Sequence, residues 1–165
     1  MIATQLAKCL PEPWRTRLLF RLGVAATPMM RYAGLRLVAL SDDSVTLSIA
    51  LSRRTRSPFN GMFFGAIATG ADAAAGLFAM KFMPETGHRV VPLVRAASSE
   101  YFKKLTGTAH FSCAQGREIY AACEQALSTG ERQDVDVEVI VTVPSQLREQ
   151  PVARITHRMS IRKLR

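Results

Sequence analysis

The chain has 165 residues, a formal net charge of +9 and an apolar content of 48%. Such a length and composition are typical of one folded domain and exclude a disordered or fibrous chain. The positive charge favours polyanionic partners, which include nucleic acid, an anionic membrane and a phosphate-rich cofactor. The three cysteines and three histidines have no metal-ligand spacing, so we expect no metal site and a reducing, cytoplasmic compartment.

The N-terminal part of the chain predicts a basic amphipathic helix over residues 11–30. Two interpretations remain open, because such a helix can fold over the edge of its own domain or lie on a membrane surface. Arginines interrupt every apolar run here, so we expect no signal peptide. The face predicted to point toward the domain holds Trp14, Leu18, Leu22 and Ala25, and the opposite face holds Arg15, Arg17 and Arg21.

Strands and one further helix account for most of the remaining chain. The alternating pattern at residues 45–51 indicates a half-buried strand that forms a hairpin with residues 35–40. Pro92 indicates a bulge or an edge position in its strand, and Gly130 ends the helix that Gly116 begins. The other expected elements are strands at 88–97, 108–114, 135–143 and 152–164, a strand or turn at 98–105, and a helix at 117–127. This order predicts an α+β domain with one antiparallel sheet and segregated helices.

The central stretch, residues 60–83, predicts a long helix that is apolar on nearly all sides and ends at Pro84. Asp72 is the one ionisable residue between Arg56 and Lys81. We expect this helix to be buried, and a buried carboxylate requires a partner. A membrane-spanning helix is excluded, because the many Gly and Ala residues contribute little transfer energy and an Asp at mid-helix opposes insertion.

Asn60, Gly65 and Ala66, followed by Asp72, form a pattern that resembles the hotdog-fold thioesterases related to phenylacetyl-CoA thioesterase. The later run LVRAASSEYFKKLTGTAHFS resembles the same superfamily, in particular a branch with an extra N-terminal helix. The resemblance implies an antiparallel sheet of about six strands wrapped around one long central helix. It divides the chain into an N-terminal helical extension, residues 1–34, and a hotdog domain, residues 35–165.

The resemblance also implies an acyl-CoA thioesterase that works as a homodimer, with a dimer of dimers as a larger assembly. Asp72 would be the catalytic acid, acting as base or nucleophile, and backbone N–H groups near Gly65 of the partner subunit would stabilise the oxyanion. Asn60 would serve at the start of the helix or cap it. No cofactor is expected, since coenzyme A is part of the substrate. The expected substrate-binding residues are Phe63, Phe64, Arg95, Ser98, Ser99, Lys103 and Lys104.

Each of these assignments has an alternative. Asp72 can be a buried structural acid, the aromatic residues can be plain core, and the basic residues can form a solvated strand face. Phe64 replaces the first glycine of a pair found in relatives, and Phe63 stands where many relatives have His. These departures favour a second hypothesis, a non-catalytic acyl or acyl-CoA binding dimer. A third, a nucleic-acid binder, has only the charge in its favour, and no aromatic-interleaved basic motif supports it.

Overall fold

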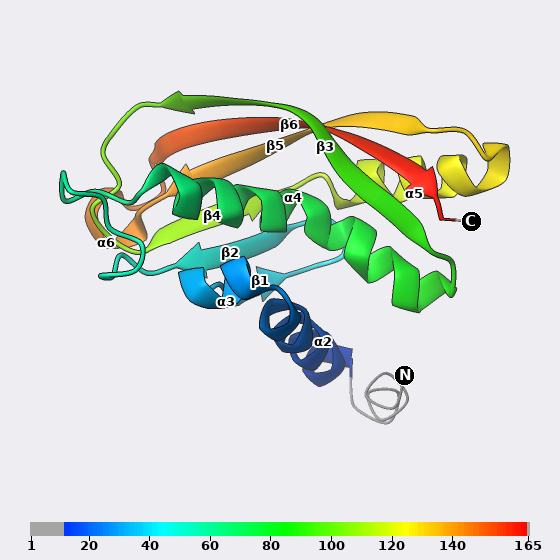
Figure 1. The fold of residues 1–165 in the computed structure, drawn as a ribbon, viewed down its shortest axis with the longest axis horizontal. Coiled ribbons are helices and arrows are strands. Elements are labelled where there is room, and N and C mark those ends of the chain that lie inside the picture. The colour runs from blue at the N-terminus through cyan, green and yellow to red at the C-terminus, as the bar shows by residue number, and fades with distance from the viewer. Residues whose placement is uncertain (1–11, 165) are drawn as a thin grey trace.

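The computed structural model describes residues 12–164, which form one six-stranded sheet with helices against one of its faces (Figure 1). The order of helices and strands confirms the predicted α+β class. The helices are α2 (Glu12–Ala26), α3 (Pro28–Ala33), α4 (Phe64–Thr86), α5 (Gly116–Thr129) and α6 (Pro144–Leu147). The strands are β1 (Arg36–Leu40), β2 (Val45–Ile49), β3 (Val90–Tyr101), β4 (Ala109–Cys113), β5 (Gln133–Thr142) and β6 (Pro151–Lys163).

All neighbouring strands of the sheet are antiparallel, in the order β1-β2-β4-β5-β6-β3. Strand β3 therefore lies at one edge, and its pairing with β6 is shifted between Val94 and Ala96. Both observations confirm the interpretation of Pro92 as an edge or bulge signal. The outer face of the sheet is polar, with ion pairs that join Asp136 to Arg158 and Glu138 to Arg154.

Helix α4 crosses the inner face of the sheet, and its small residues let it approach the strands closely (Figure 1). A β-carbon added at Gly70 would lie 2.5 Å from the ring of Phe111 on β4, so only glycine fits there. The predicted ends of this helix are wrong. It begins at Phe64 rather than Asn60, and it continues through Pro84 to Thr86, where Gly87 ends it in a left-handed conformation. Pro84 cannot donate the helical hydrogen bond to the carbonyl of Met80, and the helix ends two residues after it.

The N-terminal helices α2 and α3 lie below α4 (Figure 1) and pack on the core through Phe20, Val24 and Met30. The predicted inward face of α2 is therefore wrong. Leu18 and Leu22 are 36% and 41% exposed, and Phe20 and Val24, on another side of the helix, pack on the core instead. The side chain of Trp14 lies outside the described residues, as do the first eleven residues.

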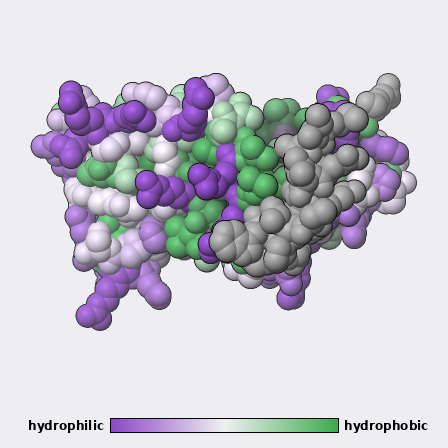
Figure 2. All heavy atoms as spheres, turned by 90° about the horizontal axis from the view of Figure 1, so that it is seen from below, coloured by the Kyte–Doolittle hydropathy of each residue, from purple (hydrophilic) through white to green (hydrophobic). Residues whose placement is uncertain are grey.

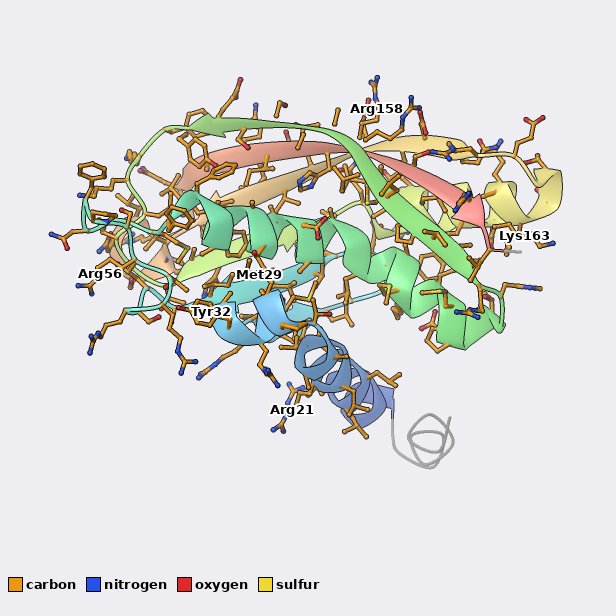
Figure 3. The ribbon with its side chains drawn as sticks, in the orientation of Figure 1. Arg21, Met29, Tyr32, Arg56, Arg158 and Lys163 are labelled. Carbon is orange, nitrogen blue, oxygen red and sulfur yellow. The ribbon has the colours of Figure 1, made fainter. Side chains whose placement is uncertain are left out.

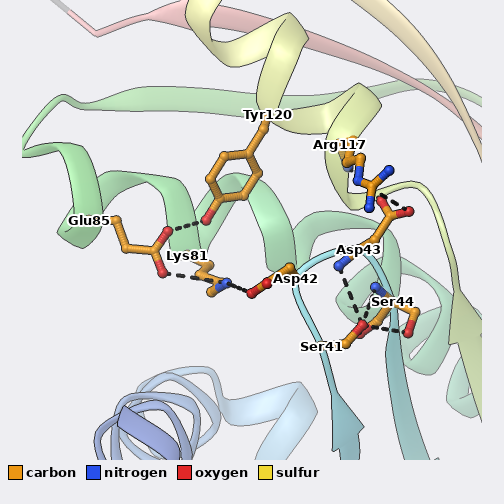
Figure 4. A network of polar contacts seen from close by, with 8 residues as sticks. All are labelled: Ser41, Asp42, Asp43, Ser44, Lys81, Glu85, Arg117 and Tyr120. Atoms are coloured by element: carbon orange, nitrogen blue, oxygen red, sulfur yellow. Dashed lines mark hydrogen bonds and ion pairs between the residues drawn. The ribbon is translucent and has the colours of Figure 1, made fainter.

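The turn between β1 and β2 ties helices α4 and α5 to the sheet (Figure 4). The Asp43 carboxylate accepts a hydrogen bond of 2.8 Å from the Arg117 backbone N–H at the start of α5. Tyr120 of α5 donates a hydrogen bond to Glu85 of α4, and its ring packs edge-on against Phe82 with centroids 5.4 Å apart. Burial and the neighbouring Glu85 carboxylate together raise the pKa of the Tyr120 hydroxyl.

No helix among residues 12–164 combines the length and apolar character that crossing a bilayer requires. Seen from the side of α2 and α3, apolar surface lies near the middle of the molecule between polar side chains (Figure 2). The exposed side chains on this side include Arg21, Met29, Tyr32 and Arg56 (Figure 3). The Arg54 guanidinium lies 5.8 Å from the centre of the Tyr32 ring, which links the loop before α4 to α3.

Candidate functional site

A cavity of about 780 Å³ lies between the N-terminal helices and the central helix. Its walls come from α2, α3, β1, α4, β3 and one residue of β6, so the N-terminal segment helps to build it. Most of its lining is apolar, and its ionisable side chains are Asp72, Lys81 and Glu85. The full lining is Leu19, Phe20, Gly23, Val24, Thr27, Met30, Leu37, Leu40, Asp72, Ala73, Gly76, Leu77, Met80, Lys81, Pro84, Glu85, Pro92, Leu93, Val94 and Met159.

Helix α4 contributes one continuous stripe to this cavity. The stripe begins at Asp72 and passes Gly76 and Met80 at the four-residue spacing that places helical side chains on one face. At its far end Lys81 lies 3.5 Å from Glu85 and 4.0 Å from Asp42. At about 1.5 Å per residue, Asp72 and Lys81 are about 13 Å apart along the helix axis. The cavity therefore has an acid toward one end, the ion pair of Lys81 and Glu85 toward the other, and an apolar wall between them.

Asp72 is exposed in the single chain, which corrects the prediction that this carboxylate is buried. The buried side of α4 is made of residues such as Ala71, Ala74 and Phe78, which face the sheet and α5. Composition alone suggested a helix covered on nearly every side, because Ala and Gly are compatible with either environment. The structure instead leaves one stripe of α4 open, and Asp72 lies on it.

The sequence pattern did not indicate a functional role for His157 of β6. Its side chain is buried, and its Nδ1 has no hydrogen-bond partner among the described residues. Burial lowers the pKa of this imidazole, and the nearby Asp72 carboxylate acts in the opposite direction. Alternation along β6 directs His157 to the inner face of the sheet, together with Ile155 and Met159. Its proximity to Asp72 depends on the packing of α4 across the sheet, which local sequence does not reveal.

The N-terminus of α4 has two backbone N–H groups without a backbone acceptor among the described residues, those of Phe64 and Gly65. The N–H of Phe63, by contrast, donates to the carbonyl of Thr55 at 2.7 Å. A helix N-terminus with free N–H groups favours negative charge, which is what an oxyanion requires. The Phe63 ring lies beside Gly65, 3.0 Å from where a β-carbon would be.

Asn60 does not cap the helix. The residue before the first helical turn is Phe63, whose side chain makes no capping bond. Asn60 has a φ of 59° in a turn where its N–H donates to the carbonyl of Ser57, at 3.1 Å. Asn adopts this left-handed conformation more readily than most residues, which is a structural reason for its presence.

A second cavity, of about 620 Å³, lies at this end of α4 and brings together three of the predicted substrate-binding residues. These are Phe64, Lys103 and Lys104, which come from α4 and from the segment after β3. The Nζ of Lys103 donates to Gln150 at 3.1 Å. The complete lining is Ser57, Phe59, Gly61, Met62, Phe64, Ile67, Tyr101, Phe102, Lys103, Lys104 and Leu105.

Three other predicted substrate-binding residues lie on β3, outside both cavities, and Phe63, the residue just before α4, lines neither cavity. Arg95 is on the outer face of the sheet, where its guanidinium lies 2.7 Å from Asp134. Ser98 and Ser99 are exposed, and their register opposite Thr156 and Ile155 directs them to opposite faces. The structure therefore groups the two lysines with Phe64 and places Arg95 elsewhere.

Within one chain, Gly65 and Asp72 do not meet at one point. Seven residues of helix separate them, about 10 Å along the axis, and Gly65 lines neither cavity. A single subunit therefore does not bring the Asp72 carboxylate and the N–H groups at the start of α4 close to the same reacting atoms.

The sequence and the fold both have relatives. A family described as Domain of unknown function (DUF4442) matches residues 15–161. Among curated proteins, no significant relative was found.

Solved structures share the fold over nearly the whole chain. The protein OLEI01261 of unknown function from Chlorobaculum tepidum TLS is 14% identical with a TM-score of 0.75, and covers 98% of this chain and 97% of its own. Thioesterase HI1161 from Haemophilus influenzae is 14% identical with a TM-score of 0.63, covering 86% and 87%. A mutant of thioesterase PA1618 from Pseudomonas aeruginosa is 14% identical with a TM-score of 0.60, covering 88% and 94%. At such identities the likeness shows the hotdog fold alone.

Proposed function

Since the chain belongs to the DUF4442 family and has the fold of the hotdog thioesterases, we propose that it hydrolyses acyl-CoA thioesters. The observation that carries this proposal is the position of Asp72, an accessible carboxylate on an apolar cavity that lies beside the helix. An apolar pocket with few polar groups suits an acyl group whose carbonyl end must react. The free cysteines Cys113 and Cys123 are compatible with a reducing compartment such as the cytoplasm.

The proposed reaction is the attack of water on the thioester carbonyl. Asp72 accepts a proton from the water as the oxygen–carbon bond forms, and the carbonyl oxygen becomes an oxyanion. Donors such as the N–H groups of Phe64 and Gly65 would stabilise that oxyanion. When the carbon–sulfur bond breaks, the leaving thiolate takes up a proton, which gives a carboxylic acid and free coenzyme A. As an alternative, Asp72 attacks the carbonyl itself and water hydrolyses the resulting anhydride.

A homodimer is part of this proposal, because the acid and the N–H donors are separated within one chain. The free edge of β3 is exposed from residue 95 to residue 101, and it can pair with the same edge of a second copy. In such an arrangement Gly65 of one subunit would approach Asp72 of the other. Lys103 and Lys104 would then be available to the phosphates of coenzyme A.

Replacement of Asp72 by Asn tests the catalytic role. We expect the variant to lose at least about a hundredfold in kcat/KM on a panel of acyl-CoAs, because the base is removed while size and shape are retained. Glu124→Gln, which changes an exposed acid on α5, is the matched control and should keep the parent's rate. Thermal unfolding checks that both variants fold. An Asp72→Asn variant as fast as the parent would exclude the assigned role, and a monomer in light scattering would exclude the shared site.

The second candidate is an acyl-CoA binding dimer without turnover. The position of the Phe63 ring beside Gly65 favours it, because the ring can obstruct the approach of a carbonyl to those N–H groups. Calorimetry distinguishes the two functions. Saturable binding of acyl-CoAs of several lengths, with no free thiol released over hours, would select the binding protein.

A further inference from the structure

We propose that the cavity between α2 and α4 holds the tail of a medium-chain, unbranched acyl group, on the order of ten carbons long, and that Gly23 and Gly76 provide the room for it. This inference rests on the proposed function in one respect, namely that the thioester end of the ligand lies at Asp72. The location and chemistry of the tail are argued from the cavity itself.

The wall of the cavity matches an alkyl chain. Leu19 and Val24 of α2 lie across from Leu77 and Met80 of α4, and Leu37 of β1 and Leu93 of β3 complete the lining. Each methylene that leaves water for such a lining contributes about 0.8 kcal/mol in transfer measurements, without any requirement for direction. A ligand that is polar along its length would gain nothing here.

Gly23 and Gly76 are on opposite walls, and among the described residues a β-carbon added at either would meet no atom of another element within 4 Å. Gly70, on the same helix as Gly76, has the Phe111 ring in this position and is required for packing. No such requirement applies to Gly76, although a glycine inside a helix is less favourable than alanine by as much as about 1 kcal/mol. The lack of a side chain at Gly76 therefore adds open volume to the cavity and nothing to the core.

The polar groups at the two ends limit the length of the tail. Asp72 is at one end, and Lys81, which pairs with Glu85, lies toward the other, about 13 Å away along the axis of α4. A fully extended polypeptide backbone advances ~1.2 Å per covalent bond. An extended alkyl chain with a similar advance would fit about eleven bonds between Asp72 and Lys81. A longer tail would have to bury methylenes against an ion pair, which neither partner favours.

The experiment compares acyl-CoA binding in an Asp72→Asn background, where hydrolysis cannot consume the ligand. Calorimetry with butyryl-, decanoyl- and palmitoyl-CoA, with coenzyme A as the blank, measures the contribution of the tail. We expect decanoyl-CoA to bind at least about tenfold more tightly than butyryl-CoA, because its additional methylenes are buried. Palmitoyl-CoA should gain nothing over decanoyl-CoA.

Gly76→Phe fills the cavity from α4, and Gly23→Leu fills it from α2. Either should abolish the preference for decanoyl-CoA over butyryl-CoA and leave the affinity for butyryl-CoA within about threefold of the background. Ala121→Phe adds similar bulk at an exposed position of α5 and should leave the preference unchanged. Using two filling variants from different walls keeps the test valid if one of them does not fold.

The outcomes separate this inference from the proposed function. If the parent hydrolyses thioesters and both filling variants keep the parent's chain-length preference, the tail lies elsewhere and the inference is wrong. If the parent hydrolyses nothing while decanoyl-CoA binds and the filling variants lose this preference, the cavity assignment stands and the hydrolase is excluded. A steady rise in affinity up to palmitoyl-CoA would overturn the length limit.

Discussion

The Asp72 carboxylate on α4 acts to raise the pKa of His157 on β6. Burial of the imidazole lowers this pKa by more, so the pKa of His157 is lower than usual. Two elements that are far apart in sequence thus place an accessible acid near a buried neutral base. The Nδ1 of His157 has no partner among the described residues, so its protonation state depends on burial and on Asp72.

Replacement of Asp72 by Asn should lower the pKa of His157 further. The substitution removes the negative charge that favours the imidazolium and leaves the burial unchanged. Nuclear magnetic resonance of the imidazole protons over a pH titration measures the value in the parent and in the variant. A His157 pKa that is equal in both proteins would show that the two side chains do not interact.

The stability of the fold should decrease as the pH falls below about 6.5, the usual value for histidine. Because the folded-state pKa of His157 is lowered, the unfolded chain binds a proton in this range before the folded chain does. The contribution of His157 is fully present above a pH of about 6.5 and is lost as the pH falls toward the folded-state pKa. Its slope is at most about 1.4 kcal/mol per pH unit.

Urea denaturation at several pH values measures this slope. His157→Gln should remove it, whereas the matched variant His88→Gln should retain it. Equal slopes in the two variants would assign the pH dependence to other groups.

Two alanine substitutions in the same helix should have opposite effects. Gly70→Ala brings a β-carbon to 2.5 Å from the fully buried Phe111 ring, and overpacking of this kind costs about 1–3 kcal/mol. The added β-carbon of Gly76→Ala meets no other element within 4 Å in the part of the chain that the structure describes, so this substitution should stabilise the helix by as much as about 1 kcal/mol. Chemical denaturation of the two variants and the parent gives both differences. A stabilised Gly70→Ala variant would contradict the close contact between α4 and β4.

The two buried cysteines should react with a thiol reagent only after unfolding. Burial raises the pKa of Cys123 to about 11 and also raises that of Cys113. At a pH of about 8 the thiolate of Cys123 is therefore roughly one part in a thousand, and access is blocked as well. A Cys9→Ser background removes the cysteine outside the described residues, and mass spectrometry counts the labels. Rapid labelling of the native protein at either cysteine would contradict this burial.

The alternation of apolar and polar residues predicted the strands well, because a strand that is buried on one face has apolar residues at every second position. Along β6, Ile155, His157 and Met159 are buried and Arg154 and Arg158 are exposed, as alternation along a strand requires. The helical boundaries were less predictable. Asn60 and Pro84 are local signals, but the start of α4 depends on the bond from Phe63 to Thr55, a contact between two loop segments.

The candidate site could be predicted only in part. Asp72 was identifiable as a single charge in an apolar stretch, but its exposure was not, because alanine and glycine patterns are similar on buried and open faces. The contribution of α2 was missed for a related reason. Leu18, Leu22, Phe20 and Val24 form two apolar sides of one helix, and sequence alone does not reveal which side packs inward.

The edge strand β3 also restricts how copies of the chain can accumulate. Pro92 has no N–H to donate, and the irregular pairing next to Arg95 interrupts the edge, so a continuous ladder is available only from Ala96 to Tyr101. A short ladder of this kind suits one reciprocal pairing and offers little to an endless stack of strands. The irregular half of β3 thus confines regular pairing at this edge to the residues from Ala96 to Tyr101.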